Sequence, residues 1–345
     1  MKTLIKKVAD SMLSIEKSNF EEKCPISIVD INKWEWAQGV GLYGLYRYYE
    51  VTGDKNHLDY IKKWFKDRIN EGLPEKCVNT CAPLLTLTFI YDGEKEYEDL
   101  MREWALWLMN DLDRVGENGF AHSGSGVVCY DQLWDDTLFM CVLFLARAGI
   151  LFENNEWLEE TKRQFLVHLR YLTDTKTGLM FHGWTFKDQS NLAGALWGRG
   201  NAWITVCIPD YIDIMGDKLE AGIKNYLTEV LATQIKALKK YQAPSGMWRT
   251  LINHEDSYEE ASATAGFGYG IHKAVRLGYV SEEYAPCAAK ALDAIKECIG
   301  ENGVVDKVSY GTGLSYDINY YNRVPIQPMT YGQALTILFL SESMN

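Results

Sequence analysis

Apolar positions along the chain recur with a helical period in six similar units. In each unit a short polar or small-residue stretch leads into a helix that is apolar on nearly all sides, and a charged amphipathic helix usually follows. The apolar helices are expected to begin near positions 34, 79, 134, 198, 260 and 330. A helix that is apolar all round is typical of a buried position, whereas an amphipathic helix covers a core from outside.

The amphipathic helices complete the pattern. Five of the six apolar helices are followed by one, such as 55-KNHLDYIKKWFKDRI and 156-EWLEETKRQFLVHLRYL. The sixth ends at the C-terminus without one, and the amphipathic N-terminal stretch supplies the missing partner. This predicts an all-α fold, an (α/α)6 barrel of six inner and six outer helices. Because no Ser/Gly linker or charge run divides the chain, we expect residues 1–345 to form one barrel domain.

Composition narrows the functional classes. The chain is 47% hydrophobic and 24% charged, which is typical of a globular protein with a substantial core. Its 11 Trp, 21 Tyr and 12 Phe can fill that core or stack on sugar rings, and composition leaves both interpretations open. The net charge of −12 argues against nucleic acid, whose binding needs clustered Lys and Arg, and against an anionic membrane surface. No apolar run is long enough to predict a transmembrane span.

The N-terminal stretch and the cysteines indicate in which compartment the protein is found and whether a metal site is expected. The N-terminal stretch is basic but lacks the apolar core and cleavage site of a signal peptide. Eight Cys in such a chain indicate free thiols in a reducing compartment, so we expect a cytoplasmic protein. The closest pair, Cys77 and Cys81, has no paired Cys or His spacing beside it, so no metal or organic cofactor is predicted. The oligomeric state stays open between monomer and homodimer.

Polar residues gather at the predicted starts of the inner helices. In such a barrel the inner helices run parallel, so their N-termini share one end. Free backbone N–H groups and helix dipoles make that end suited to a carboxylate or phosphate. The residues at these starts are Asp135, Asp136, Arg199, Gly200, Asn201, Glu260 and Thr330.

The stretch QLWDDTLFMC places two adjacent acids between a Trp and an apolar run. One Asp can cap the helix, for about 1 kcal/mol, which leaves the other for chemistry. Burial beside Trp134, Trp197 and Trp203 can raise a carboxyl pKa by about 3–5 units, more than the helix dipole lowers it. We therefore expect Asp135 to cap the helix, and Asp136 to hold a proton near neutral pH and act as a general acid.

The stretch LWGRGNAWI holds an arginine between two glycines. At the mouth of an acidic protein, Arg199 is best explained as an anion clamp, because guanidinium matches a carboxylate with two hydrogen bonds. Asn201 is a plausible N-cap. The alternative is a capped helix with two packing tryptophans. The clamp interpretation requires Trp197 and Trp203 to be at least partly exposed to a cavity.

Two histidines have a supporting context. The stretch 179-LMFHGWTF is expected to form an apolar strand or loop whose His182 and Trp184 make a lip that contacts a ligand. His122 lies in 119-GFAHSGSGVV, a Gly/Ser-rich loop able to cover the mouth. A lone His is more often structural, so both interpretations stay open for each.

Taken together, WDDTLFM, FHGW, WGRGNAW, SYEEASATAGFGYG and YGQAL resemble glycoside hydrolase family 105, the unsaturated rhamnogalacturonyl hydrolases. Family 88, the unsaturated glucuronyl hydrolases, is a more distant relative. The resemblance spans about residues 30–340. It implies an (α/α)6 barrel that acts on oligosaccharides left by polysaccharide lyases, of the pectin or rhamnogalacturonan type. The non-reducing end of these substrates is a 4,5-unsaturated uronic acid.

The resemblance also implies roles for residues. The Asp before Thr-Leu-Phe-Met is the family's general acid/base, and here it is Asp136, whereas Asp135 takes a position that is usually apolar. Members often carry a second acid where this chain has Asn79, and a Lys where Ser123 follows the histidine. The substrate-binding residues implied are Trp36, Asn79, His122, Trp134, His182, Trp184, Trp197, Arg199, Asn201 and Trp203.

The reaction suits a single acid. Ordinary glycosidases need two carboxylates across the anomeric carbon. An unsaturated uronide is a vinyl ether, so one carboxyl can protonate C4 and then, as a carboxylate, activate the water that adds at C5. Two alternatives remain. A sugar epimerase or isomerase on this barrel usually has paired histidines on inner helices, and no such pair is obvious. A non-catalytic sugar-binding descendant is compatible with Asn79 in place of the second acid.

Overall fold

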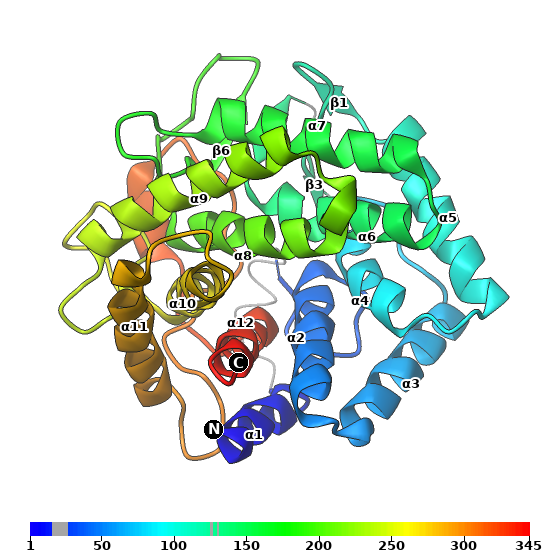
Figure 1. Cartoon of the computed structure of the whole chain (residues 1–345), viewed down its shortest axis with the longest axis horizontal. Coiled ribbons are helices and arrows are strands. Elements are labelled where there is room, and N and C mark those ends of the chain that lie inside the picture. Colours follow the sequence, from blue (N-terminus) through cyan, green and yellow to red (C-terminus); the bar gives the residue numbers. More distant parts are fainter. Residues whose placement is uncertain (16–26, 125–126, 130) are drawn as a thin grey trace.

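Six inner helices form a closed ring in the computed structural model, which describes residues 1–15, 27–124, 127–129 and 131–345. Each inner helix packs against the next, and the last packs against the first, which closes the ring (Figure 1). These helices are buried along most of their length. They are α2 (Trp36–Thr52), α4 (Ala82–Ile90), α6 (Leu143–Leu151), α8 (Gly198–Met215), α10 (Ala261–Arg276) and α12 (Thr330–Glu342).

Six outer helices surround this ring in the described part of the chain. Helix α1 packs on α12, and each of the others packs on the inner helix that precedes it (Figure 1). They are α1 (Lys2–Met12), α3 (Lys55–Glu71), α5 (Lys95–Asn110), α7 (Asn155–Leu172), α9 (Ala221–Tyr241) and α11 (Ala285–Glu297). The predicted (α/α)6 barrel is confirmed, and so is the pairing of the N-terminal helix with the last inner helix.

Local sequence signals set the helix boundaries. Glu35 precedes α2 and its carboxylate accepts the backbone N–H of Trp36. The left-handed Gly53, with φ of 72°, ends this helix. Glu260 caps α10 by accepting the Ala263 N–H at 2.6 Å. Side-chain oxygens before a helix and a left-handed glycine after it satisfy backbone groups that the helix itself leaves unpaired.

Short antiparallel strand pairs and single-turn helices join the helices at the edges of the ring. The strand pairs are β1 (Arg114–Val115) with β2 (Gly119–Phe120), β3 (Ser123–Gly124) with β4 (Val127–Val128), β5 (Gln132–Trp134) with β6 (Gly183–Thr185), and β7 (Trp248–Arg249) with β8 (Glu259–Glu260). The short helical segments are η1 (Asn79–Cys81), the π-helical η2 (Leu138–Val142), η3 (Gly216–Lys218), η4 (Glu282–Tyr284) and η5 (Ile318–Arg323). The predicted strand or loop around position 183 is therefore strand β6.

Contacts at the two ends of the ring show that the inner helices run parallel. Near their starts, the ring of Trp36 on α2 stacks on Tyr331 of α12, with centroids 4.7 Å apart. Further along the helices, Asp210 of α8 accepts hydrogen bonds from Tyr43, in the middle of α2, at 2.9 Å and from Lys273, in the last turn of α10, at 2.7 Å. The helix starts therefore share one end of the barrel, as predicted.

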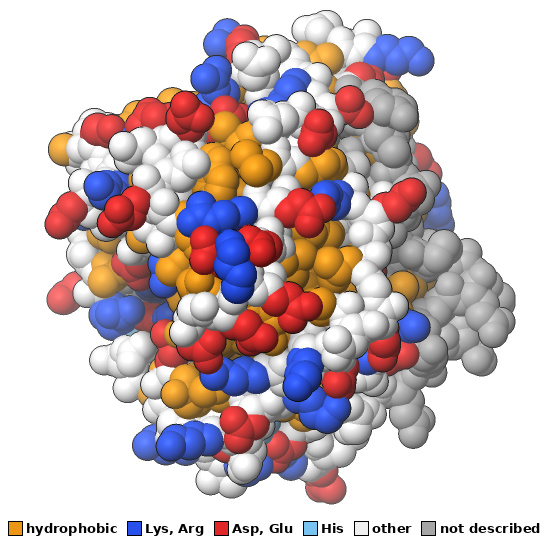
Figure 2. All heavy atoms as spheres, turned by 90° about the vertical axis from the view of Figure 1, so that its right-hand side faces the viewer, with side chains coloured by type: hydrophobic (Ala, Val, Ile, Leu, Met, Phe, Trp, Pro, Cys, Tyr) orange, Lys and Arg blue, Asp and Glu red, His pale blue; other side chains and the backbone are white. Residues whose placement is uncertain are grey.

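The outward faces of the outer helices are charged. Figure 2 faces the side formed by α3 and α5, and it shows Lys and Arg interspersed with Asp and Glu. Ion pairs one helical turn apart, such as Lys63–Asp67 and Lys95–Asp99, contribute to this pattern. Within the described ranges, no helix is both long and apolar enough to cross a membrane.

Candidate active site

Two segments far apart in the sequence meet at the paired acids. Strand β5 pairs with β6 so that Trp134 lies opposite Gly183. The pairing continues one step further, because the Asp135 N–H donates to the His182 carbonyl at 3.1 Å. The chain turns at Asp135 and becomes helical at Asp136. The π-helical η2 follows two residues later, and such wider turns occur often at functional sites.

Asp136 is held by donors from two other segments. Its Oδ1 accepts the indole N–H of Trp203 at 3.2 Å, and its Oδ2 lies 3.4 Å from Nε2 of His182. Burial alone would raise the pKa of Asp136, but contacts with His182, and then with His122 and Asp135, lower it to about 2. These contacts therefore favour the ionised form of Asp136. The expectation that desolvation keeps it protonated is wrong, because neighbouring donors favour the carboxylate more than burial disfavours it.

Asp135 has the opposite environment. Its side chain is 0% exposed, and neither carboxyl oxygen makes a well-formed hydrogen bond to any described residue. Burial, and then the charge of Asp136, raise its pKa well above the usual value. The environment of Asp135 therefore favours its neutral form. The carboxyl of Asp135 interacts with the backbone N–H of the adjacent Asp136, and neither oxygen has a well-formed hydrogen bond to a described N–H further along the helix, so the predicted cap is not confirmed.

Gly200 makes room for Asp135. The Asp135 carboxyl lies against the first turn of α8, and a Cβ added at Gly200 would come within 2.0 Å of Oδ2. No other residue type leaves that space. The glycine therefore permits the buried carboxyl, in addition to any effect it has on the local turn.

His182 is fixed on both sides of its ring. Its Nδ1 lies 2.7 Å from the Tyr321 hydroxyl, and its ring packs on Trp197 with centroids 4.2 Å apart. Burial lowers the pKa of His182, although Asp136 partly opposes this. With Tyr321 as the donor to Nδ1, the ring of the neutral histidine carries its proton on Nε2, toward Asp136.

His122 is the second neutral histidine beside Asp136. Its Nδ1 lies 3.0 Å from the Thr137 hydroxyl, and its ring stacks on Trp134 at 4.2 Å and 6°. Burial lowers the pKa of His122 to about 4. His122 therefore lies in the wall of the site rather than in a free loop. Positions 125 and 126 of the predicted loop lie outside the described residues.

The acids and His182 form a compact donor group. The ligand-type atoms of Asp135, Asp136 and His182 all lie within 4.8 Å of one another. Holding a cation with all three would require both carboxyls to be ionised. The complete burial of Asp135 disfavours its charge, so this donor set fits proton chemistry better than metal coordination.

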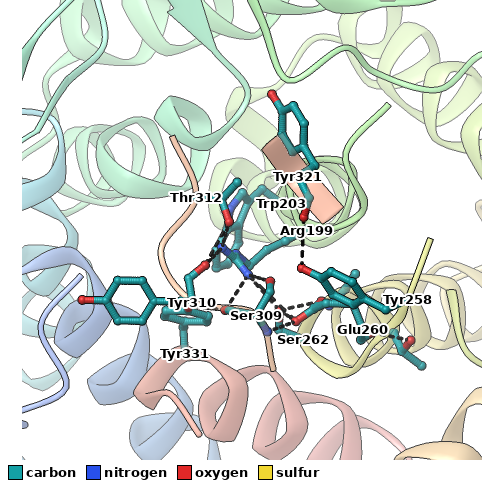
Figure 3. A network of polar contacts seen from close by, with 12 residues as sticks. Arg199, Trp203, Tyr258, Glu260, Ser262, Ser309, Tyr310, Thr312, Tyr321 and Tyr331 are labelled. Atoms are coloured by element: carbon teal, nitrogen blue, oxygen red, sulfur yellow. Dashed lines mark hydrogen bonds and ion pairs between the residues drawn. The ribbon is translucent and has the colours of Figure 1, made fainter. Parts of the chain in front are cut away.

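Arg199 is enclosed by protein. Nη1 donates to the carbonyl and hydroxyl of Ser309, at 3.1 and 2.5 Å, and Nη2 donates to the Tyr310 carbonyl and the Thr312 hydroxyl, at 3.0 and 3.1 Å (Figure 3). The side chain is 1% exposed. Arg199 thus fastens the 309–312 segment over the inner helices. Its role as an anion clamp stays a prediction, and a clamp would require this segment to move.

Arg199 also belongs to a stack of aromatic rings. Its guanidinium lies between Trp197 and Tyr331, 4.6 and 4.7 Å from their ring centroids. Tyr331 in turn stacks on Trp36. Trp36 was predicted to bind substrate, but its ring is buried and lies behind Tyr331, which separates it from Arg199.

The two tryptophans of the WGRGNAW stretch are sealed in the structure. Trp197 is 1% and Trp203 is 0% exposed, so the expectation that they face a cavity is wrong. The reason is that Trp203 turns its N–H to Asp136, while Trp197 fills the space between His182 and Arg199. Both tryptophans therefore hold residues of the site in place and do not line a cavity.

Asn201 has a different role from the one predicted. It lies inside α8, whose N-cap is Trp197, so it is not an N-cap. Its Oδ1 accepts the Met180 N–H at 2.7 Å and its Nδ2 donates to the Met180 carbonyl, also at 2.7 Å. Asn201 therefore clamps the backbone just before His182 and positions that histidine.

Two predicted residues lie away from Asp136. Trp184 packs on Tyr171 with ring centroids 5.5 Å apart, because successive strand residues face opposite sides and Trp184 lies on the side away from Trp134. Asn79 is half-buried at the start of η1, and its side chain lies close to Gly124. Asn79 thus borders the strand that follows His122.

Sequence reasoning missed the residues supplied by the late segments. Tyr321, which bonds His182, and the 309–312 segment, which encloses Arg199, carry no motif that marks them. The close contact of Asp135 with α8 depends on how two inner helices pack, and no local pattern reveals it.

The barrel and its acid centre define a class. A carboxyl at the start of an inner helix can act as a general acid and base, and histidines and aromatic rings surround it here. This arrangement is typical of the active site of a glycoside hydrolase built on a helical barrel.

Comparison with known proteins agrees with this class. The chain belongs to Glycosyl Hydrolase Family 88, whose sequence model matches residues 4–345. It is 31% identical over 316 residues to the unsaturated rhamnogalacturonyl hydrolase YesR of Bacillus subtilis, covering 90% of this chain and 89% of YesR. The family relationship inferred from the motifs is confirmed.

Solved structures support the same relationship. A possible member of the GH105 family from Salmonella enterica serovar Paratyphi A superposes with a TM-score of 0.95 at 42% identity, over 99% of this chain and 93% of that one. The unsaturated glucuronyl hydrolase of Bacillus sp. GL1 superposes with a TM-score of 0.70 at 15% identity, over 99% and 96% of the two chains. The second likeness concerns the fold alone.

Proposed function

We propose that the protein hydrolyses oligosaccharides whose non-reducing end is a 4,5-unsaturated uronic acid, with Asp136 as general acid and base. The observation that carries the proposal is the placement of Asp136, which is ionisable, only partly buried, and oriented by Trp203 and His182 at the shared end of the inner helices. Family membership and the similarity to YesR, an unsaturated rhamnogalacturonyl hydrolase, support the same substrate class.

The reaction needs one proton donor that becomes an acceptor. Asp136 gives its proton to C4 of the vinyl ether, which leaves an oxocarbenium ion at C5. Water adds at C5, and the Asp136 carboxylate takes the proton released by that water. The hemiketal that results opens, the bond to the next sugar breaks, and one water is consumed in total. No second carboxylate across the anomeric carbon is required, in contrast to ordinary glycosidases.

The negative charge of the substrate should raise the pKa of Asp136. The substrate brings its own carboxylate into the site, and a nearby negative charge raises the pKa of a carboxyl. Asp136, whose pKa is about 2 in the unliganded protein, thus gains affinity for a proton when the uronide binds. Neutral His122 and His182 can donate hydrogen bonds to the substrate or to the water without adding charge.

The surroundings suggest where the attached sugar lies. A pocket of about 400 Å³ opens beside His122, between the 74–77 segment and the C-terminal end of α5. Outer helices end where inner helices begin, so this pocket is on the same end of the barrel as Asp136. The charged residues of its lining are the acids Glu75, Asp111 and Asp113 and one cation, Lys76. This excess of acids suits a neutral sugar better than an anionic one.

We also propose that residues 1–345 act as one domain in the cytoplasm, as a monomer or homodimer. The closed ring, which uses both α1 and α12, supports one domain. The seven cysteines among the described residues are unpaired, which supports a reducing compartment.

The decisive experiment follows the conjugated double bond. Wild-type protein mixed with an unsaturated rhamnogalacturonan disaccharide should abolish the ultraviolet absorbance of the vinyl ether carboxylate, with release of the second sugar. Asp136→Asn keeps the shape of the side chain and should lower turnover by at least about 10²-fold. Asp293→Asn, an exposed acid on α11, is the matched control and should behave as wild type. Equal turnover in Asp136→Asn would remove the residue from the mechanism.

A further inference from the structure

We propose that Asp135 is a positioning residue that stores the proton delivered by Asp136, so that the two adjacent carboxyls work as a pair with one proton between them. The inference rests on the proposed function and goes beyond it, because a single acid suffices for the reaction as written.

The position of Asp135 is costly for a residue with only a structural role. The carboxyl is completely buried, and neither oxygen has a well-formed hydrogen bond to a described residue. An unpaired polar group in such a place costs free energy, and an ionised one costs far more. Gly200 is required to leave space for it. An apolar side chain would fill the same site at lower cost, so the carboxyl has a use other than packing.

The groups around Asp135 leave its proton in place. Asp136 lies on the same element, His182 precedes β6, Tyr321 lies on η5, and Arg199 and Cys207 lie on α8. Arg199, the cation of this set, is already bonded to the 309–312 segment. Arg199 and the backbone N–H of Asp136 favour a charge on Asp135, but burial and the negative charge of Asp136 outweigh them.

The proton can pass between the two carboxyls. Their oxygen atoms lie within 4.8 Å of each other, a distance that one side-chain rotation or one water spans. When the substrate carboxylate raises the proton affinity of Asp136, the O–H bond of Asp135 breaks and one forms on Asp136. Asp136 then protonates C4.

The proton balance closes at the end of the reaction. The pair carries two negative charges only while the oxocarbenium ion is beside it, which stabilises that ion. After water has added, its proton goes to Asp136 and returns to Asp135. No group is oxidised or reduced, and the pair ends as it began.

The pH dependence of Asp135→Asn tests this relay. A pair with one shared proton loses that proton only at high pH, whereas Asp136 alone loses it earlier. The variant should therefore lose at least about tenfold in kcat at neutral pH, and the alkaline limb of its kcat profile should move to lower pH by about one unit or more. A variant with the kcat and alkaline limb of the wild type would overturn the relay.

Two readouts are independent of turnover. Thermal unfolding of Asp135→Asn at neutral pH should occur at or above the wild-type temperature, because the variant no longer has to keep a carboxyl neutral inside the protein. Infrared spectra of the wild type at neutral pH should contain the C=O stretch of a protonated carboxyl. That band should persist in Asp136→Asn and be absent from Asp135→Asn.

The infrared result separates the two proposals. If no unsaturated substrate is turned over but the band is assigned to Asp135, the proposed function fails while the site of the proton stands. If the wild type has no protonated carboxyl band, the proton store is wrong, whatever the enzyme hydrolyses. This measurement also decides the case if Asp135→Asn fails to fold.

Discussion

Asp210 and Asp135 are both fully buried in the barrel, yet their surroundings have little in common. At the far end, Asp210 Oδ1 accepts the Tyr269 hydroxyl at 2.5 Å and the Lys273 ammonium at 2.7 Å, and Oδ2 accepts the Tyr43 hydroxyl at 2.9 Å. At the end where the inner helices begin, neither oxygen of Asp135 has such a partner among the described residues.

The pKa values of the two acids move in opposite directions for this reason. Burial alone would raise both. For Asp210, the charges of Lys273 and Arg47 and the hydrogen bonds outweigh burial, and its pKa is lowered. For Asp135, burial dominates and the pKa is raised. A fully paired buried charge holds helices together, whereas an unpaired buried acid keeps a proton that chemistry can use.

The largest effect is expected at the far end. Asp210→Asn removes the charge that compensates Lys273 and should lower the free energy of unfolding by about 3–5 kcal/mol, as for other broken buried ion pairs. Urea unfolding measures this change. Turnover per folded molecule should match the wild type, because the residue lies at the opposite end from Asp136. A large loss of turnover in the folded variant would show that the two ends are not separate in function.

The contact between Gly200 and Asp135 should give the next largest effect. In Gly200→Ala the new Cβ would lie 2.0 Å from Asp135 Oδ2, so the helices or the carboxyl must shift. Such overpacking costs about 1–3 kcal/mol, which thermal unfolding can detect, and turnover should fall with it. Gly222→Ala on α9 is the matched control, since a Cβ there meets nothing within 4 Å. The control should be neutral or stabilised by up to about 1 kcal/mol.

With rising pH, the contributions of Asp210 and Asp135 to the free energy of unfolding should change in opposite directions. An unfolded Asp has a pKa of about 3.9. Asp210, lowered in the folded state, contributes stability above that pH and loses it as the pH falls through its folded value. Asp135, raised in the folded state, is neutral with respect to unfolding below about pH 4 and becomes increasingly unfavourable above it.

Difference curves against the wild type check this sign. From pH 3 to pH 8, in steps of about one unit, Asp210→Asn should become relatively less stable and Asp135→Asn relatively more stable. Both differences should be smallest at the acidic end. Curves of the same sign for the two variants would contradict the contrast between a paired and an unpaired buried acid.

The smallest effect concerns the donor to Asp136. Trp203→Phe removes the 3.2 Å hydrogen bond to Oδ1 and keeps most of the ring volume. Losing one such bond costs about 1 kcal/mol of carboxylate stabilisation, so the apparent pKa of Asp136 should rise by less than about one unit. The pH profile of kcat/KM measures the shift. A shift to lower pH would mean that the indole does not stabilise the charged form.

Much of the architecture was predictable because it depends on local composition. Stretches that are apolar on all sides, such as those of α4 and α12, can only be buried helices, and the amphipathic stretches of α3 and α7 can only cover them. The shared end of the inner helices follows from that topology, so the sequence also located the functional end of the barrel. Local sequence also predicted the segment that forms β6 and the paired acids before the third inner helix.

The tertiary structure alone decided what each polar residue does. Arg199 is enclosed by residues about 110 positions later in the chain, and Asn201 fixes the backbone of Met180 instead of capping its own helix. The pKa is raised at Asp135 and lowered at Asp136, the reverse of the sequence-based expectation. The physical reason is that helix formation depends on neighbours within a turn, whereas the pKa of a buried carboxyl depends on which donors distant segments bring within about 3–4 Å of it.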